Sequence, residues 1–473
     1  MFEYVKVCPT YGPGFFYIPG SDTCLKIGGN AHFEYQWNQP YTKTQDTQGT
    51  RSQGQITFDA RNNTEYGLLR SFVSLGLVKR NGTEQSGSQE RQGNATTASN
   101  EWSTGKQTFF NYQAYVQFGG LTVGRTVSFA QSPYAFNDLQ GNPGADGRDP
   151  VSTVAYTASL GSGFRITGAL EDGTESNRDG IYTFNGTTKS ATNFLYNFSP
   201  VGGVTGGGTQ TIAAPTLFYG GNRYPDAVLA LDLDQSWGSA HLAAMTHAIN
   251  YSGTLSNAGT TNLGSGISSM IGNSMSTDIG YGVNAALKIN LDMLAKGDTL
   301  NLQGTYANGF NQMVWRNVIG DRNGNDGGGL YGYNGGWYVS GSLNDAAVDV
   351  VNNKSYLAQS YGAAGEFTHY FTPTIAGFIG GGWAHIGWAS AAQAVVASAA
   401  TTGGVGNNHP LNPANQYAVN AGVIWQPVKG FKIVPEVIYD KLQTKYITQA
   451  SGAEPATKSF DMWSTRVRVT REF

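Results

Sequence analysis

The sequence is poor in charged residues, which make up only 13% of its 473 positions. A soluble globular domain usually carries about 25% charged residues. The chain also lacks any run of about 18 apolar residues, which excludes transmembrane helices. It is instead rich in glycine, with 65 residues, and in aromatic side chains, at 12%. This composition favours a protein whose outer surface meets lipid through strands, because only every second residue of such a strand is apolar.

Three further absences narrow the class of protein. A net charge of -3 does not give the excess of positive charge that nucleic-acid binding requires. No sequence unit repeats at a fixed period, as propellers and solenoids require. The chain begins Met1-Phe2-Glu3 without a basic segment or an apolar signal core. For an exported protein, we expect Met1 to mark the start of a mature chain whose leader has been removed.

Cysteine is almost absent, and the two that occur, Cys8 and Cys24, lie close together near the start of the chain. Two such thiols suggest a disulfide formed in an oxidising compartment such as a periplasm. A reduced pair is the alternative. The disulfide would close a short loop and could stabilise the segment by roughly 3 kcal/mol.

The two ends of the chain alternate apolar and polar residues. At the end, Trp463, Thr465, Val467, Val469, Arg471 and Phe473 share one face of a strand, and Arg466 and Arg468 lie on the other. Residues 25–37 repeat this pattern after Cys24. A strand with an apolar face at the open edge of a sheet would aggregate, unless it pairs with another strand to close the sheet and turns that face to lipid. We therefore expect the first and last strands to pair.

The same alternation recurs between the ends, which gives about sixteen strands in total. The internal candidates are 55–62, 66–78, 109–118, 121–128, 151–160, 164–171, 225–235, 239–249, 278–290, 299–307, 356–371, 375–388, 416–426 and 431–442. Residues Phe110, Tyr112, Ala114, Val116 and Phe118 give one of the clearest apolar faces, which we expect to point outward.

The links between these strands alternate between short and long. Long polar links fall at 38–54, 79–108, 129–150, 172–224, 250–277, 308–355, 389–415 and 443–459. Short turns on one side and long loops on the other are typical of an outer-membrane barrel. The fold predicted is all-β: a 16-stranded antiparallel transmembrane β-barrel with short periplasmic turns and long extracellular loops.

Two segments near the N-terminus, residues 4–8 and 11–25, resemble the start of the alphaproteobacterial general porins, which include the major porins of Brucella. The terminal strand that ends in Phe473 agrees with this resemblance. It implies a periplasmic segment at 1–24, a single barrel domain at 25–473, and a homotrimer of water-filled channels for small hydrophilic solutes. It also implies that the third long loop, about 129–150, inserts as a constriction. Gly124-Arg125 is similar to the Gly-Arg that opens this loop in many porins.

In a porin, function depends on charges that face one another across a narrow aqueous passage. We expect a basic wall of inward arginines, comprising Arg61, Arg70, Arg466 and Arg468, gathered on one arc when the barrel closes. Arg125 is a further candidate, although alternation places it outward unless the chain bends there. The opposing acids would be Asp138, Asp146 and Asp149 of the inserted loop. The plainer alternative is that the arginines only pair with neighbours such as Asp59.

The sequence offers no sign of an enzyme. No Ser/His/Asp spacing, metal-ligand spacing or phosphate-binding glycine loop is present, so no catalytic residue, cofactor or metal is expected. The predicted function is passive diffusion of small hydrophilic solutes and ions across an outer membrane, with lipid and lipopolysaccharide as neighbours. The alternatives are a substrate-selective channel of the same fold and, less favoured, a plugged barrel that acts as an adhesin or enzyme.

Overall fold

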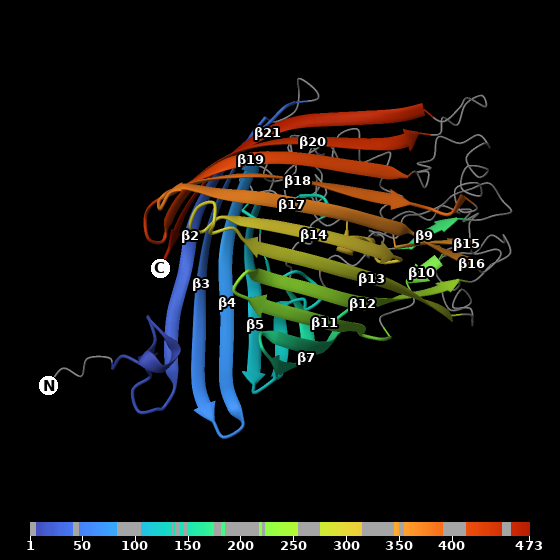
Figure 1. Ribbon diagram of the computed structural model, residues 1–473. Helices are drawn as coiled ribbons and strands as arrows, with labels where there is room; N and C mark the ends of the chain where they lie inside the picture. The colour runs from blue at the N-terminus through green and yellow to red at the C-terminus, as the bar shows by residue number, and fades with distance from the viewer. Residues whose placement is uncertain are drawn as a thin grey trace, which may run out of the picture.

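The computed structural model shows a barrel of long antiparallel strands (Figure 1). The structure describes residues 6–40, 47–82, 106–134, 136–137, 142–144, 150–174, 181–184, 217–219, 223–253, 275–314, 345–349, 354–390, 413–446 and 456–473. Among these residues, no helix is long and apolar enough to span a membrane.

Sixteen strands form the wall, because two of the 18 strands in the sheet, β1 (Phe16–Tyr17) and β10 (Leu217–Tyr219), are short additions. The wall strands are β2 (Cys24–Asn38), β3 (Gln48–Thr64), β4 (Gly67–Gly82), β5 (Lys106–Phe118), β6 (Leu121–Val127), β7 (Pro150–Gly161), β8 (Phe164–Glu171), β11 (Asp226–Gln235), β12 (Gly238–Gly253), β13 (Met275–Asn290), β14 (Thr299–Asn308), β17 (Gln359–Thr372), β18 (Ile375–Gly387), β19 (Ala414–Val428), β20 (Phe431–Tyr446) and β21 (Ala456–Glu472).

The first and last wall strands pair and close the barrel, as the terminal alternation predicted. Their register runs from Asn30 opposite Glu472 to Asn38 opposite Ser464. All sixteen predicted strands are present, and all eight predicted long links join wall strands. The short turns, the start of β2 and the C-terminus lie toward the same end of the barrel (Figure 1). The predicted fold is confirmed.

Alternation along each strand separates a lipid face from an interior face. On β11, Leu229 and Leu231 are exposed on the outside, whereas Val228 and Ala230 are buried on the inside. Because side chains of a strand point alternately to opposite faces, the outer wall is a continuous apolar band. The strand pattern therefore encodes both the barrel and its orientation toward lipid.

One predicted outward face is wrong in part. Between β4 and β5 the register skips Tyr112, since Ser74 pairs with Gln113 and Leu75 pairs with Asn111. Such a β-bulge reverses the faces beyond it. Val116 and Phe118 point outward as predicted, but Phe110 lies over Gly76 on the interior face, because a Cβ at Gly76 would collide with the Phe110 ring.

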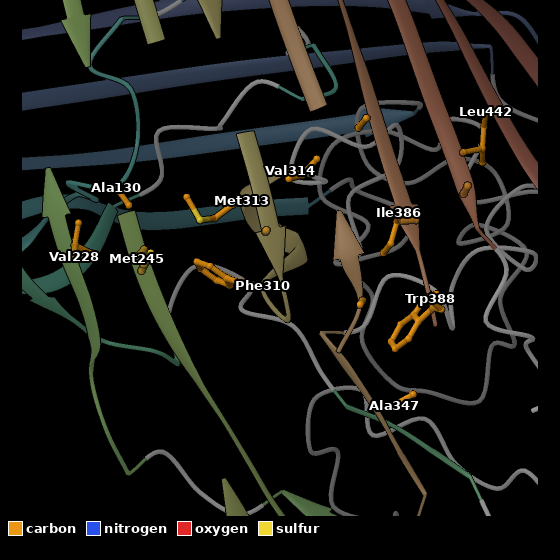
Figure 2. Packing of buried hydrophobic residues seen from close by; sticks show 14 of the residues in the cluster. Ala130, Val228, Met245, Phe310, Met313, Val314, Ala347, Ile386, Trp388 and Leu442 are labelled. Atoms are coloured by element: carbon orange, nitrogen blue, oxygen red, sulfur yellow. The ribbon is translucent and has the colours of Figure 1, made fainter. Parts of the chain in front are cut away.

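The hydrophobic core lies inside the barrel, between the wall and segments of two long links (Figure 2). One link follows β6 and supplies Ala130. The other follows β14 and supplies Phe310, Met313 and Val314, next to the short helix η3 (Asn311–Met313). The wall contributes Val228, Met245, Ile386 and Leu442. The interior is therefore partly filled by chain, and two links share that space.

Three short strands join the two longest links. β15 (Ala346–Asp349) pairs with β16 (Lys354–Leu357) and runs parallel to β9 (Ile181–Phe184). β9 belongs to the link between β8 and β11, whereas β15 and β16 belong to the link between β14 and β17. This small sheet ties two extracellular links to each other.

Candidate functional site: the interior of the barrel

The link that follows β6 crosses the interior of the barrel. The backbone N–H of Asn137 donates to both carboxylate oxygens of Glu366 on β17, at 2.8 and 3.0 Å, and its side-chain amide donates to Thr368 at 2.8 Å. Farther along, the amide of Asn142 donates to Asn420 on β19 at 3.3 Å. β6 is the fifth wall strand and β17 the twelfth, so these contacts lie almost diametrically across the barrel.

Carboxylates hold this link at two points of its described path. Near β6, Ser128 Oγ and the N–H of Phe129 donate to Glu171 on β8, at 2.7 and 2.9 Å. Both Glu171 and Glu366 are buried. Hydrogen bonds to an ionised acceptor are stronger than neutral ones. The link is therefore fixed to the wall and does not hang freely.

A row of charged side chains crosses the interior face of the neighbouring strands β21, β2, β3 and β4. Glu34 on β2 lies opposite Arg468 on β21 and opposite Arg51 on β3. Arg51 in turn lies opposite Arg80 on β4. Directly opposed residues of neighbouring strands point to the same face. The register thus places the guanidinium groups of Arg468 and Arg51 on either side of the Glu34 carboxylate, with Arg80 one strand farther away.

Glu34 is fully buried within this row. Arg468 forms a close ion pair with one of its oxygens, and Arg466 Nη1 lies 4.0 Å from the other. His32 Nε2 lies 3.8 Å from the carboxylate on the same strand. A buried carboxylate among several arginines keeps them in place, because an unpaired buried charge is costly. We call Arg51, Arg80, Arg466 and Arg468 the basic row.

Arg61 and Arg70 lie on β3 and β4, the same strands as Arg51 and Arg80, but at the opposite ends of these strands. They oppose each other on β3 and β4, next to the turn that joins these strands. Arg51 and Arg61 are ten positions apart on β3, which corresponds to roughly 33 Å along a strand. The structure therefore brings Arg466 and Arg468 together, but it does not bring Arg61 and Arg70 to them.

Asp59 binds both arginines at this lower level. Arg61 Nε and Nη2 donate to its two oxygens at 2.9 and 2.7 Å, and Arg70 Nε and Nη2 do so at 2.9 Å each. The guanidinium of Arg61 also lies 5.8 Å from the Tyr11 ring and 4.9 Å from the Phe15 ring. These rings belong to the N-terminal segment, so this cluster attaches the segment to the barrel.

Cys8 and Cys24 form a disulfide, with an S–S distance of 2.00 Å. The predicted pair is confirmed, and the two cysteines pack with Phe15 in a small core. The bond ties the N-terminal segment to the first residue of β2. The N-terminal segment is thus held covalently as well as by the arginine contact.

The remaining predicted site residues do not join the basic row. Arg125 pairs with Ser152 in register, two positions from the outward pair Val123 and Val154, and its Nε donates to the carbonyl of Asn111 at 3.3 Å. The register thus leaves Arg125 on the outward face, as alternation indicated. Asp138, Asp146 and Asp149 lie outside the described residues.

The sequence did not reveal Glu34, Arg51 and Arg80 as parts of the site. The predicted strand at 55–62 began too late to include Arg51, because residues 51–55 are all polar or glycine and show no alternation. The predicted strand at 66–78 ended just before Arg80. The pairing of β2 with β3 would have shown that Arg51 lies opposite Glu34. The sequence alone does not give the register of that pairing.

The described residues also bear on metal ligation and on the outer face of β17. Within these parts of the chain, no group of three or more His, Cys, Asp or Glu side chains could hold a metal ion. His369, between Phe367 and Phe371 on the outer face, donates from Nδ1 to the carboxylate of Asp298 at 2.7 Å. It therefore pairs with a carboxylate at the end of the barrel that carries the short turns.

A closed antiparallel barrel with an apolar outer band, a charged interior and a link folded across that interior defines the class of outer-membrane channel barrels. The chain belongs to the porin subfamily, whose family profile matches residues 1–465. Its place in the bacterial outer membrane follows from that membership and from the barrel.

Two kinds of known protein are similar to this chain. Porin Omp2b of Brucella abortus is 32% identical over 190 residues, which are 39% of this chain and 48% of that protein. Porin Omp2a of Brucella ovis is 30% identical over 190 residues, 39% of this chain and 54% of that protein. This chain spans about half the length of the curated relatives it matches.

A solved structure shares the fold over almost the whole chain. The outer membrane channel DcaP of Acinetobacter baumannii has a TM-score of 0.54 and 14% sequence identity, and the match covers 97% of this chain and 99% of that one. At this identity the likeness concerns the fold alone. The family resemblance seen in the N-terminal residues is confirmed by the family match and by the Brucella relatives.

Proposed function

We propose that this chain forms a water-filled channel through which small hydrophilic solutes and ions diffuse passively across the outer membrane. The observation that carries the proposal is the position of the link after β6, which binds β17 and β19 on one side of the barrel. The basic row lies on β3, β4 and β21. These strands belong to the arc of wall that runs from β21 through β2 to β4, on one side of the path that the link takes from β6 to β17 and β19. The aqueous path would run between this link and the basic row.

This arrangement would make the link a constriction element. A narrow aqueous passage with low-dielectric walls focuses the field of the charges that line it. Arg466 and Arg468 would form part of its basic side, together with Arg51 and Arg80, which the sequence did not suggest. Asp138, Asp146 and Asp149 remain our prediction for the acidic side, since they lie in the same link.

Liposome swelling tests the proposal directly. Purified protein reconstituted in liposomes should admit a neutral sugar such as arabinose, so that the vesicles swell in an isotonic sugar solution. A larger sugar such as raffinose should enter more slowly, because the path is narrow. A correctly folded barrel that produces no swelling with either sugar would refute passive diffusion and favour a plugged barrel.

A substrate-selective channel is the second candidate. Two observations favour it: the link after β14 also fills part of the interior, and β9 and β15 join the two longest extracellular links. Such links could provide a funnel above the path. A saturable decrease in conductance with one solute class would support selectivity, and equal behaviour of all small solutes would exclude it.

We also propose that three chains assemble into a homotrimer, surrounded by lipid and lipopolysaccharide. Ala31 on β2 is small and exposed, which suits close packing against another surface, whereas the Phe473 ring of the same chain covers the space over Gly29. Sedimentation or native mass spectrometry in a mild detergent should give about three times the mass of one 50.4 kDa chain. A single-barrel mass under several mild detergents would argue against the trimer.

A further inference from the structure

Three aromatic side chains face the interior on β4 and β5, where a water-filled barrel normally presents polar residues. Phe72 and Tyr115 oppose each other in register and stack, with ring centroids 5.3 Å apart and an interplanar angle of 27°. Phe72 shares the interior face with Ser74, which is fully buried. The third ring is Phe110, which the β-bulge at Tyr112 turns onto the interior face over Gly76.

The stacked pair Phe72 and Tyr115 and, about 13 Å farther along β4, Phe110 lie on the same interior face of the wall. We call Phe72, Tyr115 and Phe110 the aromatic strip. Each of them is half-buried, so part of each ring remains accessible. The outward face of the same strands carries its own apolar residues, such as Leu77 and Phe109. Contact with lipid therefore does not explain the aromatic strip.

A preorganised positive group adjoins this strip. The guanidinium of Arg70 lies 5.1 Å from the Phe72 ring and 5.5 Å from the Tyr115 ring. Asp59 holds Arg70 and Arg61 together through two oxygens. One carboxylate between two guanidinium groups leaves one net positive charge. Because the bidentate bonds fix the planes of both guanidinium groups, little further ordering is needed to bind an anion.

We infer that the aromatic strip and the Arg61–Asp59–Arg70 cluster together bind small aromatic carboxylates as they pass through the barrel. This inference rests on the proposed channel function and deepens it by naming a solute class. The ring of the solute would pack against Phe72 and Tyr115, which adjoin Arg70, a contact worth about 0.5–1.5 kcal/mol beyond its buried area. Phe110 lies roughly 20 Å from Arg70 along β4, so it would contact the solute only on the way to or from this position. The carboxylate would bind at the terminal N–H groups of the two arginines that Asp59 does not use, because Nε and Nη2 of each already donate to Asp59.

A purely structural role accounts for only part of the cluster. Arg61 packs on Tyr11 and Phe15, so it anchors the N-terminal segment. That anchor does not require three further rings on the interior face of β4 and β5. Nor does it require Arg70 to lie over the stacked pair. The position of the strip beside a net positive group is what points to a solute that carries both a ring and a negative charge.

Single-channel recording with added solute tests the inference. In potassium chloride, benzoate should reduce or interrupt the current in a concentration-dependent, saturable way. Acetate carries the charge without the ring, and benzyl alcohol carries the ring without the charge. Each should need at least about tenfold more solute for the same reduction, which corresponds to roughly 1.4 kcal/mol per site.

Variants assign the effect to the strip. The double variant Phe72→Leu/Tyr115→Leu should raise the half-blocking benzoate concentration about tenfold while chloride still passes. Phe109→Leu is the matched control, because Phe109 lies on the same strand but faces outward and is 65% exposed. If the double variant does not fold, Arg70→Lys keeps the charge, loses the fork, and should also weaken the effect of benzoate.

The outcomes separate this inference from the channel function. If benzoate does not reduce the current of a conducting barrel, or if acetate reduces it equally, the inference is overturned and the channel function stands. An equally strong effect of glucose would overturn it as well, since it would indicate a carbohydrate site. A folded barrel that conducts no chloride would instead refute the channel function itself.

Discussion

At the residue scale, Glu34 organises the interior charges. Its carboxylate is fully buried, and it lies beside Arg468 and Arg466 from the last strand. The pair therefore links the two strands that close the barrel, β2 and β21. Removing one partner of a buried ion pair leaves the other charge buried and uncompensated. The free-energy cost of that charge exceeds the net stability that the intact pair contributes.

Glu34→Gln should accordingly destabilise the barrel by about 3 kcal/mol, at the lower end of the range for buried pairs because Arg468 keeps some access to water. The free energy of unfolding in urea, measured in a fixed detergent, checks this. Glu472→Gln is the matched control, because Glu472 pairs with Lys432 at 3.4 Å on the exposed rim. Exposed pairs contribute about 0–1 kcal/mol. Equal losses in both variants would contradict the role of Glu34.

The double variant Arg466→Gln/Arg468→Gln should shift ion selectivity toward cations. Both side chains lie on the interior face of β21, and two positive charges would leave the path. Reversal potentials in a potassium chloride gradient measure the shift. Arg125→Gln serves as the control, since Arg125 lies on the outward face. An unchanged reversal potential in the double variant would remove Arg466 and Arg468 from the constriction.

Asp298, at the end with the short turns, gives a prediction about pH. Burial raises the pKa of its carboxyl group, but hydrogen bonds from the backbone N–H of Tyr370 and from His369 outweigh burial and hold that pKa below its usual value. A carboxyl group with a lowered pKa stabilises the folded state at neutral pH. This contribution is lost as the pH falls through the lowered pKa.

Asp298→Asn should therefore be less stable than the natural chain at pH 7, and the difference should shrink as the pH falls below about 4, the ordinary value for aspartate. Thermal unfolding of both proteins at pH 7 and pH 3 measures it. A difference that stays constant across this range would contradict the account of Asp298.

The sequence predicts which face of a strand a residue occupies only where apolar and polar residues alternate without interruption. Arg466 and Arg468 follow this rule, and their interior position was predicted correctly. Arg51 and Arg80 were missed because polar residues surround Arg51 and the predicted strand stopped before Arg80. Phe110 was placed on the wrong face, since a β-bulge depends on how two strands pair and leaves no mark in one of them.

At the scale of elements, the link after β6 is the part whose position matters most for the proposed channel. It is held by backbone donors that reach Glu366, 229 positions away in sequence. Residues so distant give no local signal, so the sequence alone predicted insertion only through the family resemblance. The insertion of the link after β14 had no such signal and was not predicted.

Glu366→Gln should loosen the link after β6, because its buried carboxylate accepts hydrogen bonds from both the backbone and the side chain of Asn137. We expect more frequent closures and greater noise in single-channel currents, with the barrel still folded. Glu65→Gln, in an exposed short turn, is the matched control. Identical current traces for both variants would show that Glu366 does not hold the link in place.

At the scale of the whole molecule, the sequence predicts the architecture well. The alternation of apolar and polar residues predicts strands with one face toward lipid. The regular succession of short and long links predicts that neighbouring strands are antiparallel. Pairing of the terminal strands then follows from the need to remove open edges. These constraints are local and repeated many times, which is why the barrel was predictable although its interior was not.

The central claim is that the space between the inserted link and the basic row is an open aqueous path. The most direct test is the conductance of a single reconstituted channel in potassium chloride. We predict a steady current that rises linearly with voltage and with salt concentration at low voltage. Protein that is folded and inserted in the bilayer, yet carries no current above that of the bare membrane, would contradict the account.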